Sequence, residues 1–415
     1  DVDILLFDEP LANLDPKTGQ TAVELIDSIH KKYNKTVIII EHRLEDVLHC
    51  DVDRIIVMNE GLIKADMSPD KLMASGILPE FGIREPLYVT VLRYAGIPVT
   101  ENLHAGRLES LAVDDVKTRL TQWSDKQPER SEKAPGKELL RAENLSFQYD
   151  LRTPYVLNGI NFSVHAGEMV SIVGTNGAGK STLAKVICGI GKHYGGELFL
   201  DGQDMRDMTI KERSQSIGYV MQNPNQMICK PMIYDEIALG LRLNGFSEEN
   251  IHERIEKVLE ICGLAPFAKW PISALSYGQK KRVTIASVLA MEPRIMILDE
   301  PTAGQDYRRY TEIMDFLKKL NDSGVTILLI THDMHLMLEY TQHALVFDAG
   351  TILLDSDSVH ALTDQNITNK AGLKVTSLYH LAEKAGIPDR QKFVHNFIDF
   401  ELRASLKTEV FRDLP

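Results

Sequence analysis

The residue types with the clearest chemistry lie in a short stretch that follows an apolar run. Residues 174–182 read Gly-Thr-Asn-Gly-Ala-Gly-Lys-Ser-Thr and come directly after Met169–Val173. Glycines at this spacing let successive backbone N–H groups wrap a polyphosphate, the lysine reaches its β and γ oxygens, and the next hydroxyl can ligate Mg²⁺. We therefore predict a nucleotide-binding loop made of Gly174, Thr175, Asn176, Gly177, Ala178, Gly179, Lys180, Ser181 and Thr182.

Two carboxylates close a later apolar run. Asp299 and Glu300 follow Ile295–Leu298, so they are expected at the end of a buried strand beside the phosphate loop. Asp299 suits Mg²⁺, directly or through water, and Glu300 suits a base that polarises the attacking water. The pair predicts hydrolysis of the bound nucleotide.

A serine and a glycine open a helical pattern between these two motifs. The segment Leu275-Ser276-Tyr277-Gly278-Gln279 precedes apolar residues at helical spacing. Free N–H groups and the positive dipole end make a helix start an anion site. On these residues alone a simple helix cap is an equal alternative. The position between the phosphate loop and the carboxylate strand favours the anion site.

The elements that must position these residues occur twice. Ile4–Pro10 matches Ile295–Pro301 at an offset of 291, and Thr36–His42 matches Thr326–His332 at an offset of 290. Val57–Gly61 matches Val346–Gly350 at 289. Matched blocks at a near-constant offset indicate a duplication. The second copy begins near residue 138, so we expect an N-terminally truncated chain that lacks roughly 150 residues of the first copy, about one domain.

The order of elements in the second copy predicts an α/β fold. Strand patterns at 139–149 and 156–164 precede the phosphate loop, a mainly helical segment covers about 232–270, and strands at 295–298, 326–330 and 344–347 alternate with helices. Such alternation implies a parallel sheet with the ligand at the carboxyl ends of its strands.

Composition limits the function classes. The chain has 415 residues, enough for two to three domains, and a net charge of −13 that argues against a nucleic-acid surface. No apolar run approaches the roughly 18 residues of a membrane span. The four cysteines are scattered, and we interpret them as buried, reduced thiols.

We divide the chain into four segments. Residues 1–75 are the C-terminal part of the first copy, 76–137 an inserted segment and linker, 138–370 a complete second copy and 371–415 a helical tail. Residues 101–137 mix acidic and basic side chains and are interpreted as a solvated linker. Within it, 113–123 has the spacing of one amphipathic helix.

These motifs together resemble the ATP-binding cassette (ABC) ATPases over nearly the whole chain. Leu275–Gln279 corresponds to the family's LSGGQ signature, with Tyr277 in place of the first glycine. The resemblance implies a P-loop NTPase cassette with a parallel core sheet, an antiparallel β subdomain and a helical subdomain. It also implies ATP and Mg²⁺ as ligands and, as phosphate-contacting signature residues, Ser276, Gly278 and Gln279.

The resemblance also assigns roles outside these motifs. Tyr149 resembles the aromatic that stacks on adenine, and Gln222 resembles the glutamine that senses Mg²⁺ and contacts the membrane partner. Asp306 lies in a match to the D-loop, and His332 resembles the switch histidine that contacts the γ-phosphate. In the first copy the same roles fall to Asp8, Glu9, Asp15 and His42, while Glu41 stands where the second copy has Thr331.

Within the family, LSYGQKKR and Glu41-His42-Arg43 resemble the tandem ATPases of energy-coupling-factor importers for vitamins, vitamin precursors and cobalt or nickel ions. The resemblance implies an ATPase on the cytoplasmic face of the membrane, with a separate integral membrane subunit and a second ATPase domain as partners. The partner would dock near Gln222, where Met227, Ile228, Met232 and Ile233 follow, although a core role suits those four nearly as well. A soluble twin-cassette ribosomal factor and an exporter or DNA-repair ATPase are the alternatives.

Overall fold

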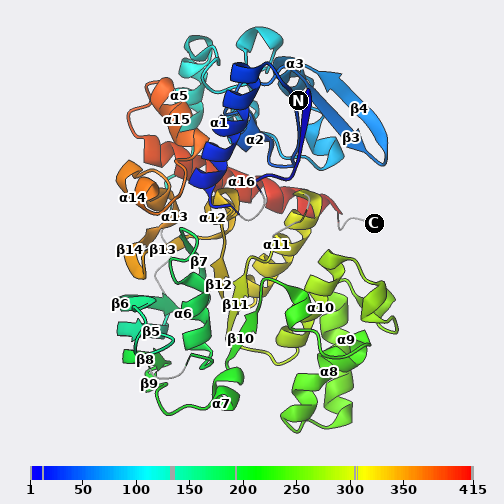
Figure 1. Cartoon of the computed structure of the whole chain (residues 1–415), viewed down its shortest axis with the longest axis vertical. Helices are drawn as coiled ribbons and strands as arrows, with labels where there is room; N and C mark the ends of the chain where they lie inside the picture. Colours follow the sequence, from blue (N-terminus) through cyan, green and yellow to red (C-terminus); the bar gives the residue numbers. More distant parts are fainter. Residues whose placement is uncertain are drawn as a thin grey trace. The chain divides into compact units, whose positions relative to one another are not determined.

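The chain forms two compact units (Figure 1). The computed structural model describes residues 2–11, 14–130, 136–191, 194–302, 305 and 307–412. Among these, the first unit combines 2–130 with 307–308 and 359–412, and the second contains 136–305 and 309–358. Within the described ranges, no helix has the length and apolarity needed to cross a bilayer.

A six-stranded sheet in the order β10-β11-β12-β7-β13-β14 forms the centre of the second unit. Its strands pair in parallel except β14, which runs antiparallel to β13. Every residue of β7, β11 and β12 is buried, which explains why these strands are continuous apolar runs. The strands are β7 (Met169–Gly174), β10 (Ile217–Val220), β11 (Ile295–Asp299), β12 (Thr326–Ile330), β13 (His343–Asp348) and β14 (Thr351–Asp357).

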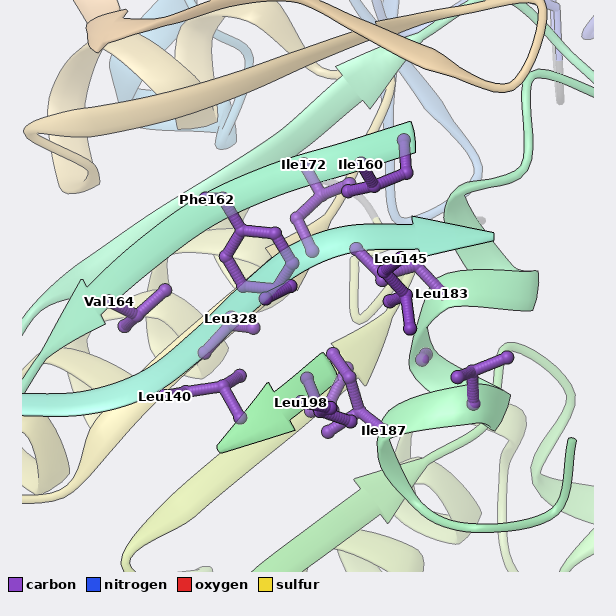
Figure 2. Packing of buried hydrophobic residues seen from close by; sticks show 14 of the residues in the cluster. Leu140, Leu145, Ile160, Phe162, Val164, Ile172, Leu183, Ile187, Leu198 and Leu328 are labelled. Atoms are coloured by element: carbon purple, nitrogen blue, oxygen red, sulfur yellow. The ribbon is translucent and has the colours of Figure 1, made fainter. Parts of the chain in front are cut away.

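An antiparallel sheet in the order β6-β5-β8-β9 accompanies the parallel one. Figure 2 shows how Leu140 and Leu145 of β5, Phe162 of β6 and Leu198 of β8 pack with Leu183 of α6 into one core. These elements are β5 (Glu138–Phe147), β6 (Leu157–His165), β8 (Gly195–Leu200), β9 (Gln203–Asp204) and α6 (Lys180–Ile187).

The remaining helices of the second unit include a group, α8 to α10, whose members contact one another. The helices of the second unit besides α6 are α7 (Ile210–Ser214), α8 (Ile233–Leu243), α9 (Glu248–Ile261), α10 (Tyr277–Leu289), α11 (Tyr307–Asp322) and α12 (Met334–Tyr340). The parallel sheet, the antiparallel sheet and the helical group confirm the predicted fold class, and the predicted strands agree with the observed ones to within a few residues.

The first unit contains two short sheets and helices from both ends of the chain. β1 (Ile4–Asp8) pairs with β2 (Thr36–Ile40) in parallel, and β3 (Ile55–Asn59) with β4 (Leu62–Met67) as a hairpin. Its helices are α1 (Pro16–Tyr33), α2 (Leu44–Val47), α3 (Pro69–Ser75), α4 (Leu87–Tyr94), α5 (Lys117–Asp125), α14 (Gln365–Lys370), α15 (Ser377–Lys384) and α16 (Arg390–Arg412); α13 (Ser358–Ala361) precedes α14. Short 3₁₀ helices of the two units lie at Leu78–Phe81, Glu101–Leu103, Val113–Asp115, Pro224–Gln226, Ala265–Phe267 and Ile272–Ala274.

The expectation of a solvated linker over 101–137 is wrong for residues 101–124. Leu103, Leu111, Leu120 and Trp123 are buried, because the apolar residues between the charged ones face helices of the same unit. The single helix expected over 113–123 is instead a 3₁₀ turn followed by α5. The acidic and basic residues of this segment therefore lie on the outer surface of a folded segment whose apolar residues are buried.

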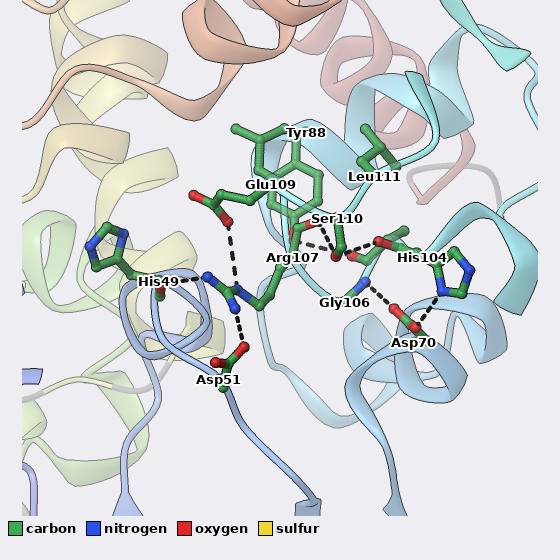
Figure 3. Close-up of polar contacts among 12 residues, drawn as sticks. His49, Asp51, Asp70, Tyr88, His104, Gly106, Arg107, Glu109, Ser110 and Leu111 are labelled. Carbon is green, nitrogen blue, oxygen red and sulfur yellow. Dashed lines mark hydrogen bonds and ion pairs between the residues drawn. The ribbon is translucent and has the colours of Figure 1, made fainter. Parts of the chain in front are cut away.

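Polar contacts fix the loop 104–111 of this segment, as Figure 3 shows. The Asp70 carboxylate accepts from the Gly106 N–H at 2.7 Å, and Arg107 pairs with Asp51 and donates to the His49 carbonyl at 3.3 Å. From α15, Lys384 donates to the Leu108, Glu109 and Leu111 carbonyls at 2.9, 2.6 and 3.0 Å. The inserted segment and the C-terminal helices thus belong to one folded unit.

The interpretation of all four cysteines as buried is also partly wrong. Cys188 and Cys262 are buried, but Cys50 is half-buried and Cys229 is exposed. Cys229 lies between a 3₁₀ turn and α8, where the chain runs over the surface. All four are free thiols.

Candidate functional site

The phosphate loop connects β7 to α6, as the sequence predicted. Gly174 has φ +138°, and a Cβ there would lie 2.0 Å from the Phe347 carbonyl oxygen of β13. Gly179 has φ +105°, and its Cβ would lie 2.8 Å from the Val156 carbonyl oxygen. Only glycine fits either position. The loop therefore passes close to β13 and β6 with its backbone alone, which fixes its shape.

The lysine of this loop lies over the loop backbone. Lys180 is 6% exposed, and its Nζ donates to the Gly174 carbonyl at 2.7 Å and to the Thr175 carbonyl at 2.9 Å. The buried Thr182 shares a hydrogen bond of 3.1 Å with the Tyr149 hydroxyl. The Tyr149 ring is 61% exposed and packs edge-on against Phe147. The structure thus places a cation at the loop and an exposed aromatic face beside it.

Two carboxylates lie at the end of β11. Asp299 is 7% exposed, and its Oδ2 accepts from the Tyr219 hydroxyl at 3.1 Å. Glu300 has φ +47°, and its N–H donates to the Ile330 carbonyl of β12 at 2.9 Å. This left-handed conformation is strained for a residue with a side chain, and such strain clusters at functional sites.

Burial controls the chemistry of Glu300. It raises the pKa of this carboxyl to about 8; the Asp299 charge adds to the rise, and the Lys180 ammonium opposes it. Glu300 Oε1 lies 3.4 Å from His332 Nε2, and both side chains are largely buried. A carboxyl whose pKa lies near neutrality, beside an imidazole, can exchange protons with a neighbouring water.

The predicted signature begins α10. Ser276 Oγ accepts from the Gln279 N–H at 3.3 Å, and Gln279 Oε1 accepts from the Ser276 N–H at 2.9 Å, which forms a capping box. A Cβ at Gly278 would lie 2.6 Å from Gln305 Oε1, so a larger residue here would have to displace the Gln305 side chain. The helix-cap alternative is therefore realised in the structure, and an anion role would use the N–H groups that remain. Asp306, Ala303 and Gly304 lie outside the described residues.

The predicted docking region follows β10. The Gln222 side chain is exposed, and Ile233 is fully buried, which gives that residue a core role. Met227, Ile228 and Met232 are half-buried, so the structure supports neither role alone for them.

The first copy repeats the local geometry of β11 and β12. Glu9 has φ +45°, and its N–H donates to the Ile40 carbonyl at 2.9 Å. Its Oε1 lies 3.8 Å from His42 Nδ1, and the side chains of Glu9 and His42 are 48% and 38% exposed. The matching residues are therefore placed alike, in a more open setting.

Glu41, whose effect the sequence left open, fixes the loop that carries His42. Its buried carboxylate accepts from the N–H groups of Leu11, His42 and Arg43 at 3.2, 3.1 and 3.4 Å. In the second copy the Thr331 hydroxyl accepts one such bond, from the Asp333 N–H at 3.0 Å. The carboxylate therefore replaces the hydroxyl and holds more of the loop backbone.

Sequence reasoning missed two residues that contact this site. Tyr219 bonds Asp299, and Lys281, 2% exposed, donates to backbone carbonyls after β10 and at the end of β11. The available signal was a lysine on the apolar face of α10, one helical turn after Tyr277.

Comparison with known proteins gives the family. Residues 157–303 match the ABC transporter family, and residues 75–147 match a family described as ATP-binding cassette cobalt transporter. A protein of Clostridium perfringens named as an ABC transporter ATP-binding protein is 53% identical over 97% of this chain and 70% of its own length. One from Vibrio vulnificus is 48% identical over 100% and 72%.

Solved structures agree with this family. The cbiO1 protein of Clostridium perfringens, described as part of the ABC transporter complex cbiONQ, has a TM-score of 0.52 and 33% identity. The match covers 60% of this chain and 99% of the cbiO1 chain. The chain therefore belongs to the ATP-binding proteins of ABC transporters and is an ATPase.

Proposed function

We propose that the chain is the ATP-hydrolysing motor of an energy-coupling-factor importer, which takes up a vitamin, a vitamin precursor or a metal ion through a separate transmembrane subunit. The observation that carries this proposal is the inserted segment, because residues 75–147 match a family described as ATP-binding cassette cobalt transporter. The likeness to cbiO1, itself described as part of a cbiONQ complex, supports it. The chain would work at the cytoplasmic face of the membrane.

In this proposal the second unit binds ATP at the phosphate loop. The backbone N–H groups of residues 174–182 surround the phosphates, and Lys180 moves from its carbonyl partners to the β and γ oxygens. Tyr149 is exposed next to the loop, and its ring would stack on adenine. Ser276, Gly278 and Gln279 would contact the γ-phosphate bound to the partner cassette, and Asp306 would act at the same interface.

Mg²⁺ fits the oxygen donors of this site. Asp299 supplies a carboxylate, Ser181 a hydroxyl next to Lys180, and Gln222 an amide oxygen on the loop after β10. Glu300 Oε1 is buried without a hydrogen bond among the described residues, which leaves acceptor capacity at this place. No cluster of three or more His, Cys, Asp or Glu side chains suited to a metal occurs in the described ranges, so ATP would supply the other ligands. When bound, the ion neutralises phosphate charge.

Hydrolysis in this proposal depends on Glu300 and His332. Glu300 orients the attacking water and accepts its proton, and His332, 3.4 Å away, contacts the γ-phosphate and stabilises the charge that develops there. Glu9 and His42 would have these roles in the first copy.

Uptake assays with the membrane partner test the proposal. The chain would be co-purified with its membrane subunits, reconstituted in vesicles, and supplied with ATP and either cobalt or nickel ions or a set of vitamins. ATP-dependent accumulation of one class of solute is expected, and Glu300→Gln should abolish it. Sedimentation of the chain with ribosomes, and not with membranes, would instead support the soluble twin-cassette alternative.

A further inference from the structure

The signature turn and the loop after β10 are joined at one backbone oxygen. The Gln222 carbonyl accepts a hydrogen bond from the Tyr277 hydroxyl at 3.2 Å and from Lys281 Nζ at 2.8 Å. Tyr277 and Lys281 are four residues apart on α10, so their side chains project from the same face of the helix. A carbonyl oxygen has two lone pairs, and both are used here. We call these three groups the Gln222 clamp.

The lysine of the clamp is held more deeply than the tyrosine. Lys281 is 2% exposed, and its ammonium also donates to the Met221 carbonyl at 2.9 Å and to the Asp299 carbonyl at 3.3 Å. An ammonium has three donors, and here three carbonyl oxygens satisfy them. The lysine therefore connects α10 with the end of β11, where the two carboxylates lie.

The loop on the other side of the clamp is internally braced. The Met221 N–H approaches Met227 Sδ at 3.1 Å, and Asn223 Oδ1 accepts from the Asn225 N–H at 3.0 Å. These two contacts lie within the loop itself and hold its shape next to the Gln222 carbonyl. Gln222 itself keeps an exposed side chain that is free to reach a ligand.

We propose that Tyr277 and Lys281 are positioning residues that make the signature turn and the Gln222 loop move as one body. The Tyr277 hydroxyl donates a hydrogen bond to the Gln222 carbonyl that a glycine in the same place cannot make. In this proposal, that bond is the function of the departure from the LSGGQ pattern. Nucleotide contact at Ser276 is then transmitted to Gln222 through α10, and the Lys281 bonds transmit the same motion to the end of β11. This inference rests on the proposed roles of Gln222 and Ser276.

Tyr277→Phe tests the clamp, since it removes one hydroxyl from a ring that is 42% exposed. We expect kcat for ATP hydrolysis by the full chain to fall about three- to tenfold, the effect of one lost hydrogen bond, while KM for ATP changes less than about twofold. Amide hydrogen exchange should rise in residues 221–226. The matched control is Tyr234→Phe on α8, whose hydroxyl makes no hydrogen bond among the described residues.

Lys281→Met gives a second and larger perturbation, because three carbonyl oxygens lose their donor. We expect kcat to fall at least about tenfold. Its control is Lys257→Met on α9, an exposed lysine whose Nζ lies 3.6 Å from Glu292 Oε1 and, among the described residues, makes no hydrogen bond to α10 or to the loop after β10. The control should keep kcat and melting temperature near those of the wild type.

Three outcomes would overturn the inference. One is a Tyr277→Phe protein with the kcat and the exchange rates of Tyr234→Phe. Another is a parallel loss of kcat, ATP affinity and melting temperature in both clamp variants, which would mean a structural role only. The third distinguishes the clamp from the proposed ATPase site on which it rests. If Glu300→Gln keeps its turnover, the proposed site itself is wrong. If Glu300→Gln loses turnover and Tyr277→Phe is unaffected, only the clamp is wrong.

Discussion

The two copies of the strand pair β1–β2 and β11–β12 have the same register but opposite burial. Ile4 pairs with Thr36 as Ile295 pairs with Thr326, and the glutamate after each first strand has a positive φ. Yet β11 and β12 are buried throughout, whereas alternate residues of β1 and β2 are exposed. β10 and β7 flank the second pair, while β1 and β2 form a two-stranded sheet among the described residues.

This difference shows that the turn at the glutamate depends on the two strands alone, whereas the burial of its side chain depends on the neighbouring strands. The turn that presents Glu9 or Glu300 needs only the two strands, since its N–H bonds the opposite strand at 2.9 Å in both copies. The desolvation that raises the pKa of Glu300 to about 8 needs the rest of the sheet. The turn geometry is thus the same in both copies of this chain, and in the second copy the glutamate and histidine side chains are also largely buried.

The largest expected effect concerns the two glutamates. Glu300→Gln should lower kcat for ATP hydrolysis about 10³-fold, because the amide keeps the shape and loses the basicity. Glu9→Gln, with the same backbone geometry, should lower it far less, since the phosphate loop shares a sheet with Glu300. Steady-state hydrolysis measures both. Equal losses would show that the open copy contributes equally to turnover.

Burial is tested with a pair of isoleucines at equivalent positions. Ile330 is 1% exposed and Ile40 is 51% exposed. Ile330→Ala should lower the free energy of unfolding by about 2–5 kcal/mol, through lost apolar contact and the cavity left behind. Ile40→Ala should change it by less than about 0.5 kcal/mol. Urea unfolding followed by circular dichroism compares them. A large cost at Ile40 would mean that β2 is covered in solution.

Nucleotide binding should depend on the second copy. Lys180→Ala is expected to weaken ATP binding about 10- to 100-fold, because the phosphate charge loses its cation. Lys185→Ala, on the same helix α6, is the control and should bind normally. A fluorescent ATP analogue reports both affinities. Undiminished binding by Lys180→Ala would mean that ATP binds elsewhere in the chain.

The smallest effect concerns a pair of hairpins, β3–β4 and β13–β14, which share a bulge at the same relative position. In the first, Arg54 pairs with Asp66; in the second, His343 pairs with Asp355 at 2.6 Å. Burial lowers the pKa of His343, but the hydrogen bonds to Asp355 and Glu168 outweigh it and raise the pKa to about 9. A histidine thus occupies a place where the other copy has a permanent cation.

The sign of the pH effect follows from this raised pKa. The stabilisation by His343 is fully present below the unfolded value of about 6.5 and is lost as pH rises through about 9. His343→Arg should remove this loss, so the wild type should lose about 1 kcal/mol more than the variant between pH 6.5 and 9.5. Urea unfolding at both pH values measures it, with His252→Arg on the exposed side of α9 as the control. Parallel pH profiles of wild type and His343→Arg would contradict the prediction.

Much of the candidate site could be located from the sequence, because its residues end buried strands or start helices. The predicted positions of the phosphate loop between a strand and a helix, and of Asp299 and Glu300 at the end of a buried strand, agree with the structure. Lys281 and Tyr219 were missed because both act through contacts between elements far apart in the chain. The stretch 101–124 was misjudged because its many charges suggested exposure to solvent, whereas the tertiary packing that buries Leu103 and Leu120 cannot be seen in the sequence.

The division into units has a consequence for synthesis of the chain on the ribosome. The first unit takes its parts from residues 2–130 and 359–412, so its last helices leave the ribosome only after the second unit has been made. At about 5–20 residues per second, the early part waits roughly ten seconds or more for α15 and α16. During that time Tyr94 and Trp123 lack Phe397 and Phe393 of α16, against which their rings pack, so nascent chains are open to aggregation and proteases in this interval.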